Sequence, residues 1–251
     1  IPQIAQNLTR SGVKDIPKVC PVCGGKTEIR QVSNAKALYC TNPECQAKHV
    51  KAFALFASRD ALNIEGLSEA TLEKFIDRGF IKEFTDIFHL DKWQEEIQTM
   101  EGFGEKSYKN LIANVEKAKV TTLPKVIYAL GIPGIGLANA KVICREFSGD
   151  VDRMIHATAE ELAEIQGVGE VLAGAFVTYF QDEKHVESLK RLLKELEIPK
   201  EEESESQQIF AGVNFVITGS VEHFANRGEV KELIESLGGK VTGSVTSKTN
   251  Y

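Results

Sequence analysis

A repeat with a period of 32 to 36 residues runs through the middle of the chain. Four segments share an apolar residue, any residue, a glycine, a second apolar residue and a small residue: Ile64–Ser68, Met100–Gly104, Ile132–Gly136 and Ile165–Gly169. Each lies between stretches whose apolar residues recur three and four positions apart, as on one face of an α-helix. The repeat predicts stacked helix–turn–helix units that bury their apolar faces against one another.

The glycines in these turns favour a phosphate-binding function. Glycine allows backbone angles and close approaches that a Cβ atom would block. The N–H groups of the turn and of the next helix's first turn then point outward together, and the helix dipole favours an anion there. Such a site reads a phosphate, not a base. One copy has an equally good explanation as a capping turn in a helical bundle, but four copies resemble helix-hairpin-helix motifs, which bind the DNA backbone.

The candidate DNA-binding residues are the turn glycines, the serine that replaces one of them, and two nearby lysines. They are Gly66, Ser68, Gly102, Gly104, Lys106, Gly134, Gly136, Lys141, Gly167 and Gly169. The second hairpin has Lys106 and Lys109 beside its turn and the third has Lys141, whereas the fourth has Glu170 and no nearby cation. We therefore expect the second and third hairpins to provide most of the DNA affinity and the fourth to be mainly structural.

Four of the five cysteines are close together, as Cys20-x2-Cys23 and Cys40-x4-Cys45 with sixteen residues between the pairs. Two thiolates on a tight turn reach one side of a zinc ion and a second pair completes the tetrahedron. The segment has almost no apolar core, so it needs the metal to fold. Four protein ligands leave no open position, which predicts a structural Zn²⁺. Two disulfides and unrelated free thiols are the alternatives, and the lack of a secretory signal favours zinc.

Charge and hydropathy indicate whether the chain binds nucleic acid or a membrane. The net charge of −6 argues mildly against nucleic acid, but the acid is concentrated in residues 199–206, PKEEESES. Residues 1–60 carry nine lysines and arginines against four acidic residues, and nucleic-acid binding depends on local basic surface. We expect no membrane partner, because no apolar stretch is long enough to span a membrane and the N-terminus does not resemble a signal peptide. The chain begins without Met, which suggests a piece of a longer protein.

The pattern changes again from Ile209 onward. Phe215-Val216-Ile217 predicts a short strand, RGEVKELIESLGG predicts an amphipathic helix that ends at Gly238, and Val241 begins another strand. This order resembles the first half of a BRCT domain, with the later elements missing after Tyr251.

Some BRCT domains hold a phosphopeptide with a Ser or Thr after the first strand and a later Lys. Thr218 or Ser220 with Lys248 match that pattern, although ordinary turn and surface roles are favoured at these positions.

The zinc cluster, the hairpins, the acidic linker and the BRCT-like end, in this order, resemble the C-terminal part of bacterial NAD-dependent DNA ligases. The opening residues Ile1–Ile4 resemble the last strand of that family's OB-fold. The resemblance implies an enzyme that seals 5′-phosphate/3′-hydroxyl nicks in duplex DNA during replication and repair, with NAD and Mg²⁺. The family's adenylated lysine lies in a Lys-x-Asp-Gly motif, which this sequence lacks. We therefore assign no catalytic residue, expect NAD and Mg²⁺ to bind outside this chain, and do not expect the chain alone to ligate.

The expected fold is mainly α, with a small four-cysteine zinc finger, a four-repeat helix-hairpin-helix domain and a truncated α/β BRCT domain. The expected boundaries are 1–19 for the end of an OB-fold and a connection, 20–48 for the zinc finger, 49–198 for the helix-hairpin-helix domain, 199–208 for an acidic linker and 209–251 for the incomplete BRCT domain.

The expected function is to hold nicked duplex DNA without sequence preference, in the bacterial cytoplasm at the nucleoid. A protein partner for the BRCT region is a further expectation. The alternative is a self-standing adaptor that uses the hairpins for DNA and the BRCT region for a protein. A helix-hairpin-helix glycosylase fits poorly, because it needs one hairpin followed by a catalytic aspartate. A purely structural helical protein is the remaining alternative.

Overall fold

The computed structural model describes residues 16–32, 35–199, 209–219, 221, 224, 227–246 and 249–251. The chain divides into two compact units, residues 1–199 and 200–251, which we describe separately. Several sequence predictions, on Ile1–Ile4, on the linker beyond Pro199, on Ser220 and on Lys248, lie outside the described residues.

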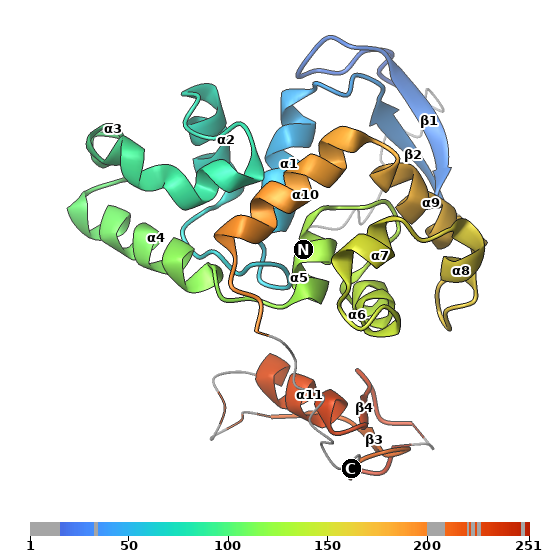
Figure 1. Ribbon diagram of the computed structural model, residues 1–251. Helices are drawn as coiled ribbons and strands as arrows, with labels where there is room; N and C mark the ends of the chain where they lie inside the picture. Colours follow the sequence, from blue (N-terminus) through green and yellow to red (C-terminus); the bar gives the residue numbers. More distant parts are fainter. Residues whose placement is uncertain are drawn as a thin grey trace, which may run out of the picture. The chain divides into compact units, whose positions relative to one another are not determined.

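The first unit has a small antiparallel sheet followed by helices (Figure 1). Its elements are β1 (Thr27–Val32), β2 (Ala35–Cys40), α1 (Gln46–Ala57), α2 (Glu69–Asp77), the 3-10 helix η1 (Phe84–Trp93), α3 (Gln94–Gln98), α4 (Glu105–Ala118), α5 (Leu123–Ala129), α6 (Leu137–Glu146), α7 (Val151–Ile155), α8 (Ala159–Ala163), α9 (Glu170–Phe180) and α10 (Glu183–Glu195). The mainly helical fold predicted from the sequence is confirmed. The sequence does not predict the β1–β2 hairpin, because its strands hold few of the aliphatic residues that mark a strand in sequence.

The helices share one continuous apolar core. Phe56, Phe75 and Phe176 are completely buried in it, and Phe56 stacks on Phe84 with 4.5 Å between ring centres. The apolar periodicity placed α2, α4, α6 and α9 correctly, because each buries a single stripe of residues. Cys144 is buried in the same core.

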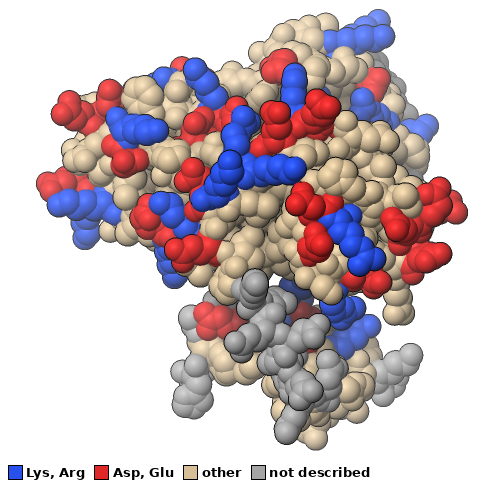
Figure 2. All heavy atoms as spheres, in the orientation of Figure 1, with Lys and Arg blue, Asp and Glu red and all other residues tan. Residues whose placement is uncertain are grey.

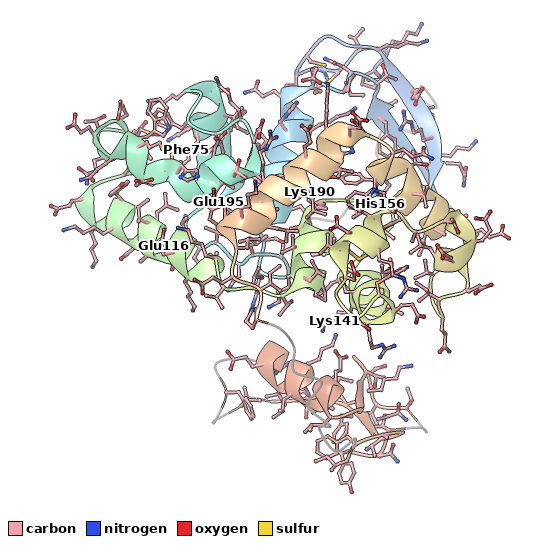
Figure 3. The ribbon with its side chains drawn as sticks, in the orientation of Figure 1. Phe75, Glu116, Lys141, His156, Lys190 and Glu195 are labelled. Carbon is pink, nitrogen blue, oxygen red and sulfur yellow. The ribbon has the colours of Figure 1, made fainter. Side chains whose placement is uncertain are left out.

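Helix α10 holds the two ends of this helical region together. It packs against both η1 and α9, and Figure 1 shows it between the α2–α4 group and the α6–α9 group. Arg191 pairs with Glu83 at 2.8 Å, and Glu195 pairs with His89 at 3.1 Å. These two ion pairs join α10 to η1 and to the residue before it, and Glu195 is labelled in Figure 3 near the C-terminal end of α10. Helix α10 therefore contacts both groups of helices, one through η1 and the other through α9.

The second unit contains a parallel β–α–β arrangement: β3 (Asn214–Phe215), α11 (Arg227–Ser236) and β4 (Lys240–Val241). The first strand is shorter than the predicted Phe215–Ile217 run, and it begins one residue earlier. The turn after α11 lies tightly on this small core, since a Cβ on Gly239 would come within 2.6 Å of Ile234 and 3.0 Å of Phe215. In neither unit does a described helix have the length and apolarity to cross a membrane.

Candidate metal centre and nucleic-acid interface

The four clustered cysteines meet at one point. Their sulfur atoms all lie within 4.8 Å of one another, and Cys20 and Cys45 are buried. The first pair is on a tight turn in which Gly24, with φ +67°, donates its N–H to the Cys20 carbonyl at 2.9 Å. The second pair comes from the end of β2 and from the residue that precedes α1. The β1–β2 hairpin thus carries Cys40 back to the turn that holds Cys20 and Cys23.

The donor set fits a tetrahedral zinc ion. The sulfurs of Cys20 and Cys45 are 3.9 Å apart, and those of Cys23 and Cys40 are 3.5 Å apart. A tetrahedron with Zn–S bonds of about 2.3 Å has S–S edges of about 3.8 Å. All five cysteines of the chain are free thiols, so the disulfide alternative does not hold in this structure. Glycine at position 25 leaves space for the cysteine sulfurs to come together, because a Cβ there would lie 3.2 Å from the Cys23 sulfur.

Hydrogen bonds around the cluster favour thiolates. The Gly25 N–H, which points at the Cys23 sulfur from 3.4 Å, lowers the pKa of Cys23 to about 6. The backbone N–H of Cys23 lowers the pKa of Cys20. Burial raises the pKa of Cys40 to about 11, so metal binding at this cluster must release at least the Cys40 proton near neutral pH.

The four hairpin turns share one backbone geometry. The first glycine of each turn has a positive φ: +97° at Gly66, +86° at Gly102, +80° at Gly134 and +91° at Gly167. In three of the turns the residue after this glycine donates its N–H to the carbonyl three residues earlier, at 2.9 to 3.0 Å. This is a type II turn, which requires glycine at its third position, and Pro133 occupies the favoured second position of the third copy. The sequence repeat therefore reflects a repeated backbone requirement.

The apolar residue between the two small positions of each turn packs toward the core. Leu67, Ile135 and Val168 are buried, and Phe103 is half-buried against Phe75 with 5.7 Å between ring centres. These side chains hold each turn against the helices.

The first and second hairpins pack as a pair. Asn114 of α4 donates its side-chain N–H to the Glu65 carbonyl in the first turn at 3.1 Å, and Lys74 of α2 donates to the Glu101 carbonyl in the second turn at 3.2 Å. Each turn is thus held by the helix that follows the other turn.

The third and fourth hairpins form a second pair on the same principle. Asn139 of α6 donates its side-chain N–H to the Gly167 carbonyl in the fourth turn at 3.1 Å. Leu172 of α9 lies so close to the third turn that a Cβ on Gly134 would be 2.7 Å from it. The four copies are therefore two interlocked pairs.

The helix starts after the turns are not equivalent. Ser68 accepts the Thr71 N–H at 3.2 Å, and Asn139 accepts the Gly136 N–H at 3.3 Å. No side chain caps Gly104 or Gly169, and a Cβ on either would have no atom within 4 Å in the described structure. Helix α6 also lacks a side-chain cap, so what distinguishes the second and fourth helix starts is the open space beside Gly104 and Gly169.

The charged groups near the turns are of mixed sign. Lys106 is exposed beside the second turn, whereas Lys109 pairs with Glu105 at 2.6 Å. Near the fourth turn Glu170 is exposed, and acidic side chains gather over α8 on the face drawn in Figure 2. On the same face lysines and arginines gather over α10. Side-chain charge alone therefore favours the second turn over the fourth.

Comparisons with known proteins cover the whole chain. The family described as helix-hairpin-helix motif matches residues 125–189, which include the third and fourth turns, and the family described as BRCA1 C Terminus (BRCT) domain matches residues 205–251. The chain is 59% identical over 251 residues to a DNA ligase of Lachnoclostridium phytofermentans, and 54% identical to one of Ruminiclostridium cellulolyticum. It is 39% identical over 258 residues to a DNA ligase of Thermosipho africanus.

All three matches extend over 100% of this chain, which spans 38% of the length of each relative. The matched families occur in the order that the sequence predicts, after a four-cysteine cluster whose sulfurs converge in space. The chain therefore belongs to the bacterial DNA ligases, as the C-terminal part that combines a four-cysteine cluster, a helix-hairpin-helix region and a BRCT domain.

Proposed function

We propose that this chain holds nicked duplex DNA for an NAD-dependent ligase, by gripping the phosphate backbone with its hairpin turns. The observation that carries the proposal is the repeated turn before a helix, in which the first glycine has a positive φ and the apolar residue after it is buried or half-buried. N–H groups at a helix start bind phosphate oxygens without reading bases. The relatives named DNA ligase favour ligation over the adaptor and glycosylase alternatives. The sealing of a 5′-phosphate/3′-hydroxyl nick is the reaction that the family resemblance implies.

The site residues of this function are those expected from the sequence: the turn positions at 66, 68, 102, 104, 134, 136, 167 and 169, with Lys106 and Lys141. Lys106 extends from the first turn of α4 and adds a charge beside the second turn. The domain boundaries expected from the sequence also stand as proposals. A protein partner for the BRCT region and a location at the bacterial nucleoid complete the proposal.

Zn²⁺ has a structural role in this proposal, bound by Cys20, Cys23, Cys40 and Cys45. All four ligand positions are filled by protein, so no position is open for substrate. NAD and Mg²⁺ would act outside these 251 residues, because the sequence has no Lys-x-Asp-Gly motif. What this chain contributes is affinity and orientation of the duplex.

Fluorescence anisotropy with nicked and intact duplexes of unrelated sequence tests the proposal. We expect similar affinity for all sequences and a decline with salt whose log–log slope is about −0.9 per phosphate neutralised. Strong preference for one base sequence, or adenylation of the chain by NAD, would contradict it.

A matched pair of lysine variants sharpens the test. Lys106→Gln, beside the second turn, should reduce the salt slope by about one phosphate contact. Lys117→Gln, an exposed position at the other end of the same helix, should leave the slope unchanged. Equal effects of the two variants would assign binding to general charge and not to the turn.

A further inference from the structure

The segment that follows α4 pairs with the segment that follows α10, as two strands of a parallel sheet do. The Glu197 N–H donates to the Lys119 carbonyl at 2.7 Å, and the Thr121 N–H donates to the Glu197 carbonyl at 3.1 Å. These bonds make Val120 the parallel partner of Glu197. Successive residues of a strand direct their N–H and C=O groups to opposite sides, so Val120 directs its own away from Glu197.

Val120 is therefore an open edge of this pairing. Among the residues that the structure describes, no hydrogen bond uses its N–H or its carbonyl. Val120 is 57% exposed, although it is aliphatic. An exposed strand edge with unused N–H and C=O groups is a template for pairing with another extended chain. The edge therefore favours a peptide over a nucleic acid, which has no main-chain N–H and C=O groups to pair with it.

A cavity of about 290 Å³ lies beside this edge and is lined in part by Val120 itself. Its apolar wall is formed by Ala61 and Leu62, which follow α1, and by Ala118, the last residue of α4, and all three are buried. The volume is at the lower limit of the roughly 300 to 1,000 Å³ of pockets that hold a whole small molecule. A space of this size and lining suits one apolar side chain from a peptide that runs past it.

Two lysines also line the cavity. Lys117 is exposed near the C-terminal end of α4, and Lys125 lies in the first turn of α5. No acidic residue lines the cavity in the described part of the chain. Interfaces place charges of opposite sign against each other. The lysines therefore favour a peptide whose apolar residue has acidic neighbours.

We propose that the edge at Val120 and the cavity beside it dock an extended peptide segment of a partner protein, with acidic residues on both sides of one apolar residue. The peptide adds a strand to the pairing: its main chain bonds to Val120, its apolar side chain enters the cavity, and its carboxylates lie near the two lysines. This surface uses none of the turn positions proposed to bind DNA. The inference therefore goes beyond the proposed function.

Fluorescence anisotropy with short peptides and the zinc-loaded 251-residue chain tests the proposal. The probe is Glu-Glu-Val-Glu-Glu, labelled at its N-terminus and amidated at its C-terminus, and the control probe is Lys-Lys-Val-Lys-Lys. We expect the acidic probe to bind roughly tenfold more tightly than the basic one, with an affinity that falls with salt. The chain has a net charge of −6, so a preference for the acidic probe must come from a local site. Equal binding of the two probes, or no binding of the acidic one, would overturn the proposal.

Methylation of the probe's backbone tests the strand pairing without any change to the protein. Only alternate N–H groups of an added strand face the edge. One methylated probe carries an N-methyl group on its valine, and the other carries it on the glutamate that follows. We expect one of them to bind roughly tenfold more weakly than the parent probe and the other to bind like it, because a single ladder bond is lost. Equal affinities of the two methylated probes would exclude main-chain pairing and overturn the proposal.

Two exposed valines provide a matched pair of protein variants. Val120→Glu places a like charge at the edge and should weaken binding of the acidic probe roughly tenfold. Val171→Glu, at a position that is 85% exposed on α9, should leave the affinity unchanged. Because both positions are exposed, both variants should keep the parent Tm within about two degrees. Equal losses of affinity would assign binding to general charge, against the proposal.

A pair of lysine variants tests the charge complementarity. Lys117→Gln should weaken binding of the acidic probe several-fold and reduce its dependence on salt. Lys92→Gln, at an exposed position near the end of η1, should change neither. If the two variants behave alike, the cavity lysines do not recognise the peptide and the proposal is wrong.

DNA and a second copy of the chain are the other possible occupants, and two measurements identify them. If an unlabelled duplex displaces the acidic probe and Val120→Glu weakens duplex binding, the surface belongs to DNA and the peptide proposal is wrong. If sedimentation shows a dimer that Val120→Glu converts to a monomer, the occupant is a second copy and the proposal is again wrong. We expect a monomer that binds the acidic probe equally well with and without a saturating duplex.

Discussion

The four-cysteine module, residues 16–45, and the hairpin region, residues 46–199, are held together in different ways. In the module the buried side chains are two of the cysteines themselves, while Val19, Val22 and Ile29 are more than half exposed. In the hairpin region one apolar core extends from Phe53 to Leu196. Because the module has no apolar core, its stability depends on the four-cysteine metal site alone. The hairpin region distributes its stability over many contacts, and single changes should act there in proportion to burial.

Removing one zinc ligand should have the largest effect. Cys40→Ser leaves three thiolates, and structural zinc contributes about 10 to 16 kcal/mol to comparable small modules. We expect the zinc content to fall from one ion per chain to none and residues 16–45 to unfold. The hairpin helices should persist, because their core does not include the module. Elemental analysis and far-UV circular dichroism measure both results.

Cys144→Ser is the matched control for this prediction. Cys144 is buried next to Met154, far in sequence from the other cysteines, and takes no part in the cluster. This variant should keep its zinc and lose only part of the stability of the hairpin region, since a buried hydroxyl costs about 1 to 3 kcal/mol. If Cys40→Ser melts the helices as completely as it releases zinc, the two regions are one cooperative unit and the comparison is wrong.

Truncation in the hairpin core should have the next largest effect. Phe176 is 1% exposed and packs on Phe180 with 4.9 Å between ring centres. Phe176→Ala should cost about 3 to 5 kcal/mol in the free energy of unfolding, measured by urea denaturation, with zinc content unchanged. Val171→Ala, on the same helix at 85% exposure, should stay within about 0.5 kcal/mol of the parent. Loss of zinc in the Phe176 variant would show that the module depends on the helical core.

The two regions also differ in how far the sequence predicts them. The cysteine spacing predicts the metal site because ligand geometry restricts which separations can close a tetrahedron. It does not predict the β1–β2 hairpin, since Ile29 and Leu38 are cross-strand neighbours that remain partly exposed. Apolar periodicity predicts the long helices of the hairpin region well, because each buries one stripe.

Periodicity does not predict how the hairpins pair. The bond from Asn139 to Gly167 and the contact of Leu172 with Gly134 join residues 28 and 38 positions apart, and no local pattern encodes them. For the same reason the lysine-based ranking of the hairpins uses only local sequence. The contacts beside Gly66 and Gly134, and the open space beside Gly104 and Gly169, are visible only once the helices are packed.

Alanine in place of the first glycine of a turn separates backbone strain from packing. Gly134 and Gly167 both have positive φ, so Gly134→Ala and Gly167→Ala should each cost about 1 to 2 kcal/mol. Only Gly134→Ala also forces a methyl group against Leu172, which adds about 1 to 3 kcal/mol of overpacking. Thermal unfolding should therefore rank Gly134→Ala below Gly167→Ala in Tm. Equal losses would mean that Leu172 moves aside freely and does not restrict the third turn.

The smallest expected effect is at Ser68, the one turn position where serine replaces the second glycine. Its hydroxyl accepts the Thr71 N–H at 3.2 Å and caps α2, in an exposed position outside the core. Ser68→Ala should cost about 1 kcal/mol, the usual value of an N-cap, and Ser68→Gly only a few tenths, because glycine leaves the same N–H open to water. Ser68→Gly also gives the first hairpin the same residue that the other three have at this position. If stability is distributed over the hairpin region as proposed, both variants keep their zinc and unfold in one transition, with the alanine variant a few degrees lower. A loss of more than about 3 kcal/mol in the free energy of unfolding for either variant would show that the hairpin region also depends on a single site. The two regions would then differ only in how strongly they depend on one site.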